Sequence, residues 1–350
     1  MYTLNICYST FCRGKRFFDD INELLQNKDK RFHVTVQDNH SEDGSFEALN
    51  NIEDPRFHLR RNDSNLTSHP SHKLSLQANN DADYLLFSID KDYINPEYIS
   101  QFIDYLEKEK PSFGFVELYK ADNRPARKFS LGYDAITNLG YLSKHPSGFF
   151  WKKDLYYQEI EKSYFKNLPM KFDFWFDVVT AHLASNYTGT IIYIPLIIHA
   201  PFRTDINYMK SPTLSYNEEN IYFGKKKRWE TYTIYINDLF SLAISLEEKQ
   251  HLAFKLTVNL INQVTLQLRK IYSNRIETDR YNIVNRRITL KEMLYNLFMS
   301  IKIYNKLLEQ YETSFARIIN SFLLIWMLLN DISKGFLKKI NNKILKWINF

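Results

Sequence analysis

The first half of the chain alternates between short apolar runs and stretches in which apolar residues recur every three or four positions. The apolar runs Thr3–Ser9, Phe32–Gln37, Phe57–Arg60 and Tyr84–Ile89 predict buried strands. Helical spacing follows the first run, from Phe17 to Leu25. Strands that alternate with helices in this way predict an α/β fold. Its mostly parallel sheet should be flanked by helices and should bind ligands at the carboxyl ends of its strands.

Further elements are expected along the rest of the chain. We expect a helix over Ser71–Asn79, a second helix that opens at Asn95 with a proline in its first turn, and a strand over Thr190–Ile198. From Trp229 onward the sequence contains no proline and a single glycine, and its apolar spacing is helical. This last part of the chain therefore predicts several helices packed together.

The distribution of charge also changes near the start of this helical part. Residues 225–350 carry 21 basic and 10 acidic side chains, whereas residues 1–224 carry 25 basic and 30 acidic ones. The change falls near the basic run Lys225–Arg228. We therefore expect two domains with different partners: an α/β domain over residues 1–224 and a basic helical domain over residues 225–350.

Composition excludes several classes of protein. Hydrophobic residues make up 44% of the chain and aromatic residues 16%, which excludes an intrinsically disordered protein. The chain has nine glycines and no Gly-rich phosphate-binding motif, so it is neither a P-loop protein nor a dinucleotide-binding protein. Cys7 and Cys12 cannot build a disulfide framework or a structural zinc site. The N-terminus lacks a signal-peptide pattern, and we expect a cytoplasmic location.

Two carboxylates follow the most apolar strand. Asp90 and Asp92 come directly after Tyr84–Ile89, spaced two residues apart. Alternate residues of an extended chain point to the same side, so both carboxylates can reach one cation. A hard divalent ion such as Mg²⁺ or Mn²⁺ is commonly bound by one or two carboxylates together with substrate phosphates. The alternative is that the two acids only open the loop before Asn95.

A second polar segment follows the strand Phe32–Gln37. It runs from Asp38 to Ser45 and contains Asn, His, Ser, Glu and Gly. A carboxylate just past a strand can accept hydrogen bonds from a base or a ribose. The same composition is also typical of a turn in which Asp or Asn side chains bond to the local backbone.

These segments, in this order and spacing, resemble those of family-2 inverting glycosyltransferases with a GT-A fold. Ile6–Ser9 with Arg13 is similar to that family's opening strand, Asp38–Gly44 to the segment after its second strand, and Asp90-Lys91-Asp92 to its metal-binding Asp-x-Asp. The resemblance covers residues 3–200. It implies a nucleotide-sugar donor and an Mn²⁺ or Mg²⁺ cofactor.

The resemblance also implies roles for individual residues on the donor side. Asp38 would bond the base of the nucleotide, Tyr8 would help to frame that base, and Arg13 would lie nearby. Asp90 would contact the ribose or the metal, and Asp92 would hold the metal on the diphosphate. The metal would then offset the charge that grows on the leaving nucleotide.

A late histidine and two tryptophans each have two interpretations. Some related enzymes take a third metal ligand from a late histidine, which here is His199, although a turn histidine between prolines is equally consistent. Trp151 and Trp175 would either stack on sugar rings or pack in the core, and the high aromatic content favours the core. His69 and His72 are interpreted as loop residues without a chemical role.

Inverting transfer also requires a general base for the acceptor hydroxyl. In the family this base is a carboxylate at a helix start, often within a Glu-Asp pair that this chain lacks. Asp173 is our first candidate and Asp177, one turn further on, is the second. Either one would alternatively be an N-terminal carboxylate that the helix dipole favours.

The C-terminal segment has an amphipathic helical pattern. Over Gly335–Ile348, aromatic and aliphatic residues fall on one helical face and lysines on the other. Such a helix can lie in the surface of an anionic membrane. The alternatives are a helix packed on the core and a homo-oligomer contact between C-terminal helices. The apolar run Phe322–Leu329 is too short to span a bilayer.

We therefore expect a glycosyltransferase of the hexosyltransferase type, cytoplasmic or peripheral on the inner face of the plasma membrane. It would move a sugar, from a UDP-sugar in the first instance, to a glycan or lipid-linked glycan of a surface polysaccharide. We expect no nucleic acid partner. Two alternatives remain: a catalytically inactive GT-A scaffold that serves as a binding module, and a nucleic-acid-binding protein that uses the basic C-terminal region.

Overall fold

The computed structural model describes residues 2–66, 68–77, 81–169, 172–199, 224–275, 278, 283–314, 317–318 and 320–325. The chain divides into two compact units. Unit 1 comprises Met1–Pro212 with Leu242–Ile244, and unit 2 comprises Thr213–Ser241 with Ser245–Phe350. The predicted boundary at residue 224 stays a prediction, because the residues just before it lie outside the described ranges.

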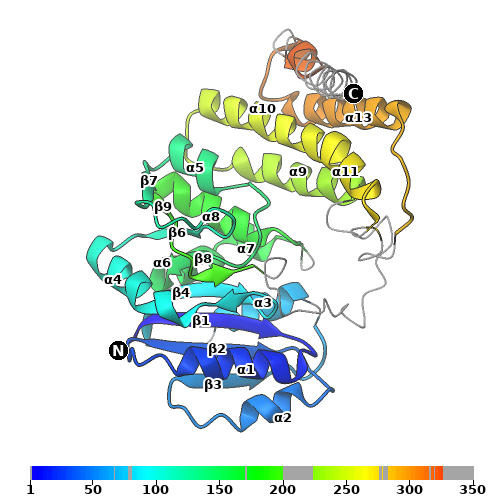
Figure 1. Ribbon diagram of the computed structural model, residues 1–350. Helices are drawn as coiled ribbons and strands as arrows, with labels where there is room; N and C mark the ends of the chain where they lie inside the picture. The colour runs from blue at the N-terminus through cyan, green and yellow to red at the C-terminus, as the bar shows by residue number, and fades with distance from the viewer. Residues whose placement is uncertain are drawn as a thin grey trace, which may run out of the picture. The chain divides into compact units, whose positions relative to one another are not determined.

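An eight-stranded sheet forms the centre of unit 1 (Figure 1). Its strands are β1 (Tyr2–Thr10), β2 (Phe32–Asp38), β3 (Phe57–Arg61), β4 (Ala82–Ile89), β6 (Phe113–Val116), β7 (Arg127–Phe129), β8 (Phe149–Lys152) and β9 (Gly189–Ile192). Their order across the sheet is β3-β2-β1-β4-β8-β6-β9-β7. β1 and β2 are buried along nearly their whole length, as expected for strands with both faces covered.

The pairings are mostly parallel. β1 runs parallel to β2 and β4, β2 to β3, and β6 to β9, whereas β8 is antiparallel to β4 and β6, and β7 to β9. In this register Thr10 lies beside Asp38, and Ser9 lies beside Ile89. The carboxyl ends of β1, β2 and β4 therefore meet at one edge of the sheet.

The strand expected over Thr190–Ile198 is two strands. β9 ends at Ile192, and β10 (Ile197–Ile198) pairs antiparallel with β5 (Tyr93–Ile94) in a separate two-stranded sheet. Pro195 lies between the two segments and has no backbone N–H to donate to a ladder, so the prediction of one continuous strand was wrong.

Helices cover the sheet of unit 1 (Figure 1). They are α1 (Gly14–Leu25), α2 (Ser45–Asn50), α3 (Ser68–Leu76), η1 (Pro96–Tyr98), α4 (Ile99–Glu109), α5 (Tyr133–Leu139), α6 (Lys153–Ile160), α7 (Ser163–Lys166) and α8 (Trp175–Asn186). Phe17 and Ile21 of α1 are buried, as their spacing predicts. The Asn95 side chain accepts a hydrogen bond from Glu97 N, which begins the η1–α4 segment as expected.

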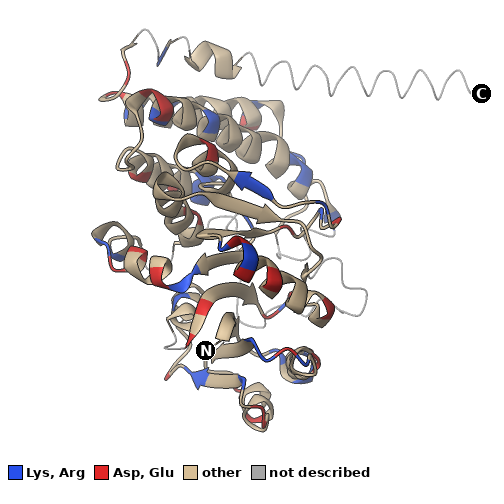
Figure 2. Cartoon of the chain, turned by 90° about the vertical axis from the view of Figure 1, so that its left-hand side faces the viewer, with Lys and Arg blue, Asp and Glu red and all other residues tan. Residues whose placement is uncertain are grey.

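Among the described residues of unit 2, the regular elements are all helices. It contains α9 (Lys225–Leu239), α10 (Leu246–Asn262), the π-helical segment η3 (Gln263–Gln267), α11 (Leu268–Tyr272) and α13 (Leu290–Leu308). Ser245 and Glu248 form a capping box at the start of α10, and Thr289 and Glu292 form another at the start of α13. Basic and acidic side chains are interspersed along these helices (Figure 2).

The α/β fold with a mostly parallel sheet, followed by a helical C-terminal region, is confirmed. Among the described residues, no helix combines the length and the apolar character that crossing a bilayer requires. The predicted amphipathic segment Gly335–Ile348 lies outside the described residues and stays a prediction.

Candidate functional site

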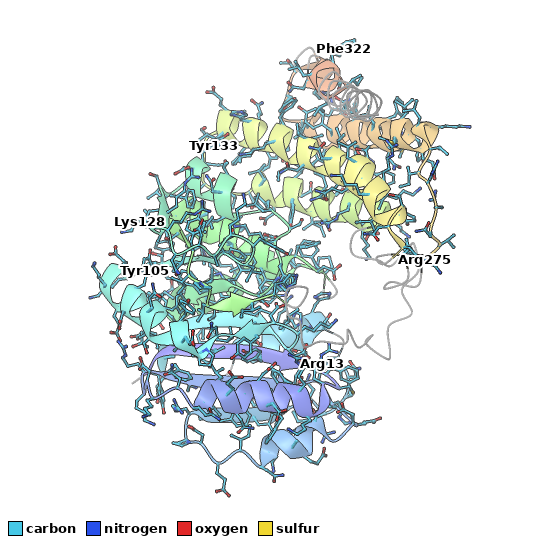
Figure 3. All side chains as sticks on the ribbon, in the orientation of Figure 1. Arg13, Tyr105, Lys128, Tyr133, Arg275 and Phe322 are labelled. Atoms are coloured by element: carbon cyan, nitrogen blue, oxygen red, sulfur yellow. The ribbon has the colours of Figure 1, made fainter. Side chains whose placement is uncertain are left out.

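The two carboxylates after β4 have different partners. β4 ends at Ile89, and the Asp92 N–H donates to the Ile89 carbonyl over 3.1 Å, so the chain turns and the strand alternation ends there. Asp90 lies 2.9 Å from Arg13 Nε and accepts a hydrogen bond of 3.0 Å from Phe11 N. Asp90 thus holds the segment that leads from β1 to α1, where Figure 3 shows Arg13. Its role as a metal ligand stays a prediction.

Asp92 lies between two histidines. Its carboxylate is buried, with Oδ1 2.8 Å from His199 Nδ1 and Oδ2 3.4 Å from His145 Nδ1. Ser147 Oγ donates to Oδ2 over 2.5 Å. One ligand atom from each of Asp92, His145 and His199 can be chosen so that all three lie within 4.8 Å of one another. This donor set fits a divalent metal ion.

The electrostatics of this group suit a cation. Burial raises the pKa of Asp92, but the hydrogen bond with His199 and the charge of His145 outweigh it and hold the pKa below its usual value. Burial lowers the pKa of His145 to about 4, although the Asp92 charge opposes that shift. At neutral pH the group therefore offers an anionic carboxylate beside an uncharged imidazole, which is the protonation state that metal binding requires.

Asp38 lies at the carboxyl end of β2 and is buried. Its Oδ2 accepts a hydrogen bond of 3.0 Å from Ser41 N and lies 3.5 Å from Arg61 Nε. Its Oδ1 has no hydrogen-bond partner among the described residues, and neither has the buried hydroxyl of the adjacent Thr10. A buried acceptor without a partner is uncommon in proteins and calls for a ligand or a water.

Tyr8 lies in β1, between the segments that hold Asp38 and Asp90. The side chain is buried in β1, and its ring packs edge to face on Phe17 of α1, with 5.3 Å between ring centroids. Its predicted contact with a base stays a prediction.

Asp173 and Asp177 differ in what they can reach. Asp173 lies in the turn before α8, with 26% of its side chain exposed, and pairs with His69 Nε2. Asp177 is 1% exposed and accepts a hydrogen bond of 3.3 Å from Leu142 N. Burial lowers the pKa of the neighbouring Lys144 to about 8, and the Asp177 charge opposes that shift. Of the two carboxylates, Asp173 is the more exposed to solvent.

The histidines of α3 were assigned wrongly to a loop. His69 and His72 both lie within Ser68–Leu76, with their rings 5.7 Å apart at right angles. Ser68 opens the helix three positions earlier than the sequence pattern indicated. Burial lowers the pKa of His72 well below its usual value.

Sequence reasoning missed His145 as a candidate ligand. It lies in the loop before β8, in the segment His145-Pro146-Ser147, and its ring is 4.2 Å from that of His199. A histidine before a proline resembles an ordinary turn residue, so the sequence carries little signal for it. Trp151 and Trp175 are fully buried among aromatic rings, which supports the core-packing interpretation over sugar stacking.

The fold is similar to that of solved structures of S. aureus TarS. TarS 1–349 superposes with a TM-score of 0.55 at 11% identity, covering 95% of this chain and 92% of that one. The complex of TarS 1–349 with UDP has a TM-score of 0.53 at 13% identity, and the match covers 87% of this chain and 80% of that chain. The complex with UDP-GlcNAc has a TM-score of 0.53 at 14% identity, and the match covers 88% of this chain and 91% of that chain. Against the longer TarS structure, this chain covers 53% of the other chain. No protein-family model and no curated protein matches the chain. The likeness shows a fold of the GT-A type.

Proposed function

We propose that the chain is a glycosyltransferase that uses a nucleotide-sugar donor. One observation carries the proposal: a single edge of a GT-A-type sheet holds both a buried, unpartnered acceptor, Asp38 Oδ1, and a metal-competent group around Asp92. Asp38 is the last residue of β2, and Asp92 lies just beyond β4. The two strands lie on either side of β1 and are thus about 10 Å apart. That separation suits a ligand with a base at one end and a diphosphate at the other. The TarS complexes with UDP and UDP-GlcNAc support a UDP-sugar as the first donor to test.

On the donor side, each residue has a distinct task. Asp38 Oδ1 accepts an N–H of the base, and Arg13, fixed by Asp90, borders the same site. Asp92, His145 and His199 would hold a divalent cation, Mn²⁺ or Mg²⁺ in the first instance. When bound, such an ion supplies Lewis-acid stabilisation of the leaving diphosphate.

On the acceptor side, Asp173 acts as the general base. Its carboxylate takes the proton of the acceptor hydroxyl as the oxygen attacks the sugar carbon, so that the product has the inverted configuration. His69 donates its Nε2–H to Asp173 and fixes the orientation of the carboxylate. Its other ring nitrogen, Nδ1, is buried without a partner, so Nε2 is the nitrogen that carries the proton. The burial of Asp177 makes it the weaker candidate.

The acceptor and the location remain proposals based on the sequence. The basic amphipathic pattern over Gly335–Ile348 suits a chain that works at an anionic membrane surface on a lipid-linked glycan. The same segment would serve equally in a contact between two copies of the chain.

Calorimetric titration with UDP, GDP and CDP, each with and without Mn²⁺, tests the proposal. We expect one nucleotide to bind more tightly with the metal, and Asp92→Ala to weaken that binding at least about tenfold. Asp83→Ala, an exposed carboxylate at the other end of β4, is the matched control and should bind normally. If folded wild-type protein binds none of the three nucleotides, the proposal is wrong. Binding without any sugar turnover would favour the inactive scaffold.

A further inference from the structure

The side of α13 that faces solvent carries large apolar side chains. α13 buries its other side in two apolar clusters of unit 2. Leu290, Leu294, Tyr295 and Phe298 are exposed, with 44% of Leu294 and 67% of Phe298 accessible to solvent. Leu290, Leu294 and Phe298 recur at every fourth position, so they follow one another along one face of the helix. A contiguous exposed apolar surface marks an interaction site.

The helical residues 320–325 extend this apolar surface. Asn305 of α13 donates a hydrogen bond of 3.1 Å to Ser321 Oγ, so this segment lies beside α13. Phe322 and Leu323 of the same segment are exposed, and Figure 3 labels Phe322. The exposed apolar side chains of unit 2 therefore come from two neighbouring elements.

Lysines occupy the remaining exposed positions of α13. They are Lys291, Lys302 and Lys306, and no exposed position of this helix is acidic. Lys302 and Lys306 are one turn apart, a spacing at which like charges repel. None of the three forms an ion pair among the described residues. Lys225 of α9 adds a further positive charge, since its Nζ lies 5.9 Å from the centroid of the Tyr295 ring. The exposed residues of α13, called the α13 face below, are thus both apolar and basic.

A bilayer with anionic headgroups matches this combination. Leucine and phenylalanine side chains enter the boundary between headgroups and acyl chains, and lysines meet the negative charge of the headgroups. A second copy of the chain would bring the same lysines against one another across a two-fold axis. The chain's own segment Gly335–Ile348 is also rich in lysine. We propose that the α13 face docks unit 2 on an anionic membrane surface.

The inference rests on the membrane location in the proposed function and adds a second contact to it. A single shallow contact holds a protein on a bilayer only marginally, and stable binding takes two. We therefore expect the α13 face and the segment Gly335–Ile348 to be required together.

Vesicle binding by the full chain tests the apolar part of the face. The chain is sedimented with vesicles of phosphatidylcholine and phosphatidylglycerol. The double variant Leu294→Asn with Phe298→Asn should bind at least about tenfold more weakly, because two apolar side chains no longer leave water. Both positions are exposed, so the variant should fold. Leu131→Asn changes an exposed leucine of unit 1, and as the matched control it should bind normally. Unchanged binding by the double variant would overturn the inference.

A second pair of substitutions tests the basic part of the face. Lys291→Gln with Lys302→Gln should weaken binding to the same vesicles at least about tenfold, because each lysine near an anionic surface contributes to binding. Lys28→Gln with Lys30→Gln, two exposed lysines of unit 1, removes the same charge elsewhere and should change binding less than about twofold. An equal loss in both variants would mean that only net charge matters, which contradicts a docking face.

The same proteins also test the other occupants of the face. Self-association of the full chain that Phe298→Asn abolishes, measured by sedimentation velocity, would make the face a contact between copies and overturn the inference. Stronger vesicle binding by the double variant would mean that the face holds the chain's own C-terminal segment, which also overturns it. A full chain that binds no phosphatidylglycerol vesicles removes the proposed membrane location as well. Nucleotide titration tests the proposed sugar transfer separately.

Discussion

At the scale of single residues, the pair His69–Asp173 joins two elements that are about 100 residues apart in the chain. α3 supplies the imidazole, and the turn before α8 supplies the carboxylate. The ring of His72 lies beside the ring of His69. It also contacts the rings of Phe87 and Phe176, at centroid distances of 5.0 and 6.2 Å. The two histidines therefore have different surroundings, and each leads to its own prediction.

Replacing His69 tests its role in orienting Asp173. The assay measures UDP release from a UDP-sugar with water as the acceptor. We expect His69→Phe to lower kcat about tenfold and to leave KM unchanged, because the Asp173 carboxylate loses its N–H donor. His69→Gln keeps an amide N–H near Nε2 and should retain most of the rate. Asp173→Asn should lower kcat by about 10²-fold or more. A wild-type rate in His69→Phe would contradict the role.

His72 makes the stability of the chain sensitive to acid. An unfolded histidine titrates near 6.5, while burial keeps the pKa of His72 well below that value in the folded chain. Below about pH 6.5 the unfolded state therefore binds more protons, and the free energy of unfolding falls as pH falls. His72→Phe should reduce this slope by up to about 1.4 kcal/mol per pH unit, measured by urea unfolding at pH 7, 6 and 5.

His145 adds a slope of the same sign, because burial lowers its pKa to about 4. The His72→Phe variant keeps that contribution, so its curve should be flatter than the wild-type curve without becoming level. Identical slopes in the two proteins would show that His72 is not the buried neutral base described above.

At the scale of elements, β6 has no room for a side chain at Gly114. A Cβ there would lie 2.5 Å from the Phe150 ring of β8 and would also meet the Thr190 carbonyl of β9. Gly114→Ala should lower the free energy of unfolding by about 3 kcal/mol through overpacking, measured by urea unfolding. Gly44→Ala is the control: its Cβ meets open space, but its φ of +83° strains any other residue, so a loss of about 1 kcal/mol is expected. A smaller loss in Gly114→Ala than in Gly44→Ala would contradict this account.

The same elements show what sequence patterns predict well. β1, β2 and β4 were predicted within one or two residues, because strands covered on both faces are continuous apolar runs. The six-residue helix α2 was not predicted, because it is too short for a helical period to show. The position and the antiparallel direction of β8 in the sheet result from its pairing with β4 and β6. No local sequence pattern encodes which strands pair or in which direction.

At the scale of the whole molecule, the proposed membrane contact depends on the C-terminal segment. A chain that ends at Ile325 should lose binding to vesicles that contain phosphatidylglycerol, since it lacks the whole amphipathic segment Gly335–Ile348 with its lysines. The full chain should sediment with the same vesicles, less so at high salt. Equal binding by both chains would contradict the proposal. Loss of self-association in the shorter chain, measured by sedimentation velocity, would favour the contact between copies.

The sequence by itself determined the class of fold and one part of the candidate site. Local periodicity and the positions of Asp38, Asp90 and Asp92 at or just after apolar strands depend only on neighbours along the chain, so the sequence shows them directly. The tertiary structure alone decided the partners: Arg13 for Asp90, His145 and His199 for Asp92, and His69 for Asp173. The physical reason is that each partner comes from a segment far away in the chain: the segments beside β1, β8 and β10 supply the partners of Asp90 and Asp92, and α3 supplies the partner of Asp173. Contacts between residues that are about 50 to 110 positions apart leave no periodic trace in the sequence.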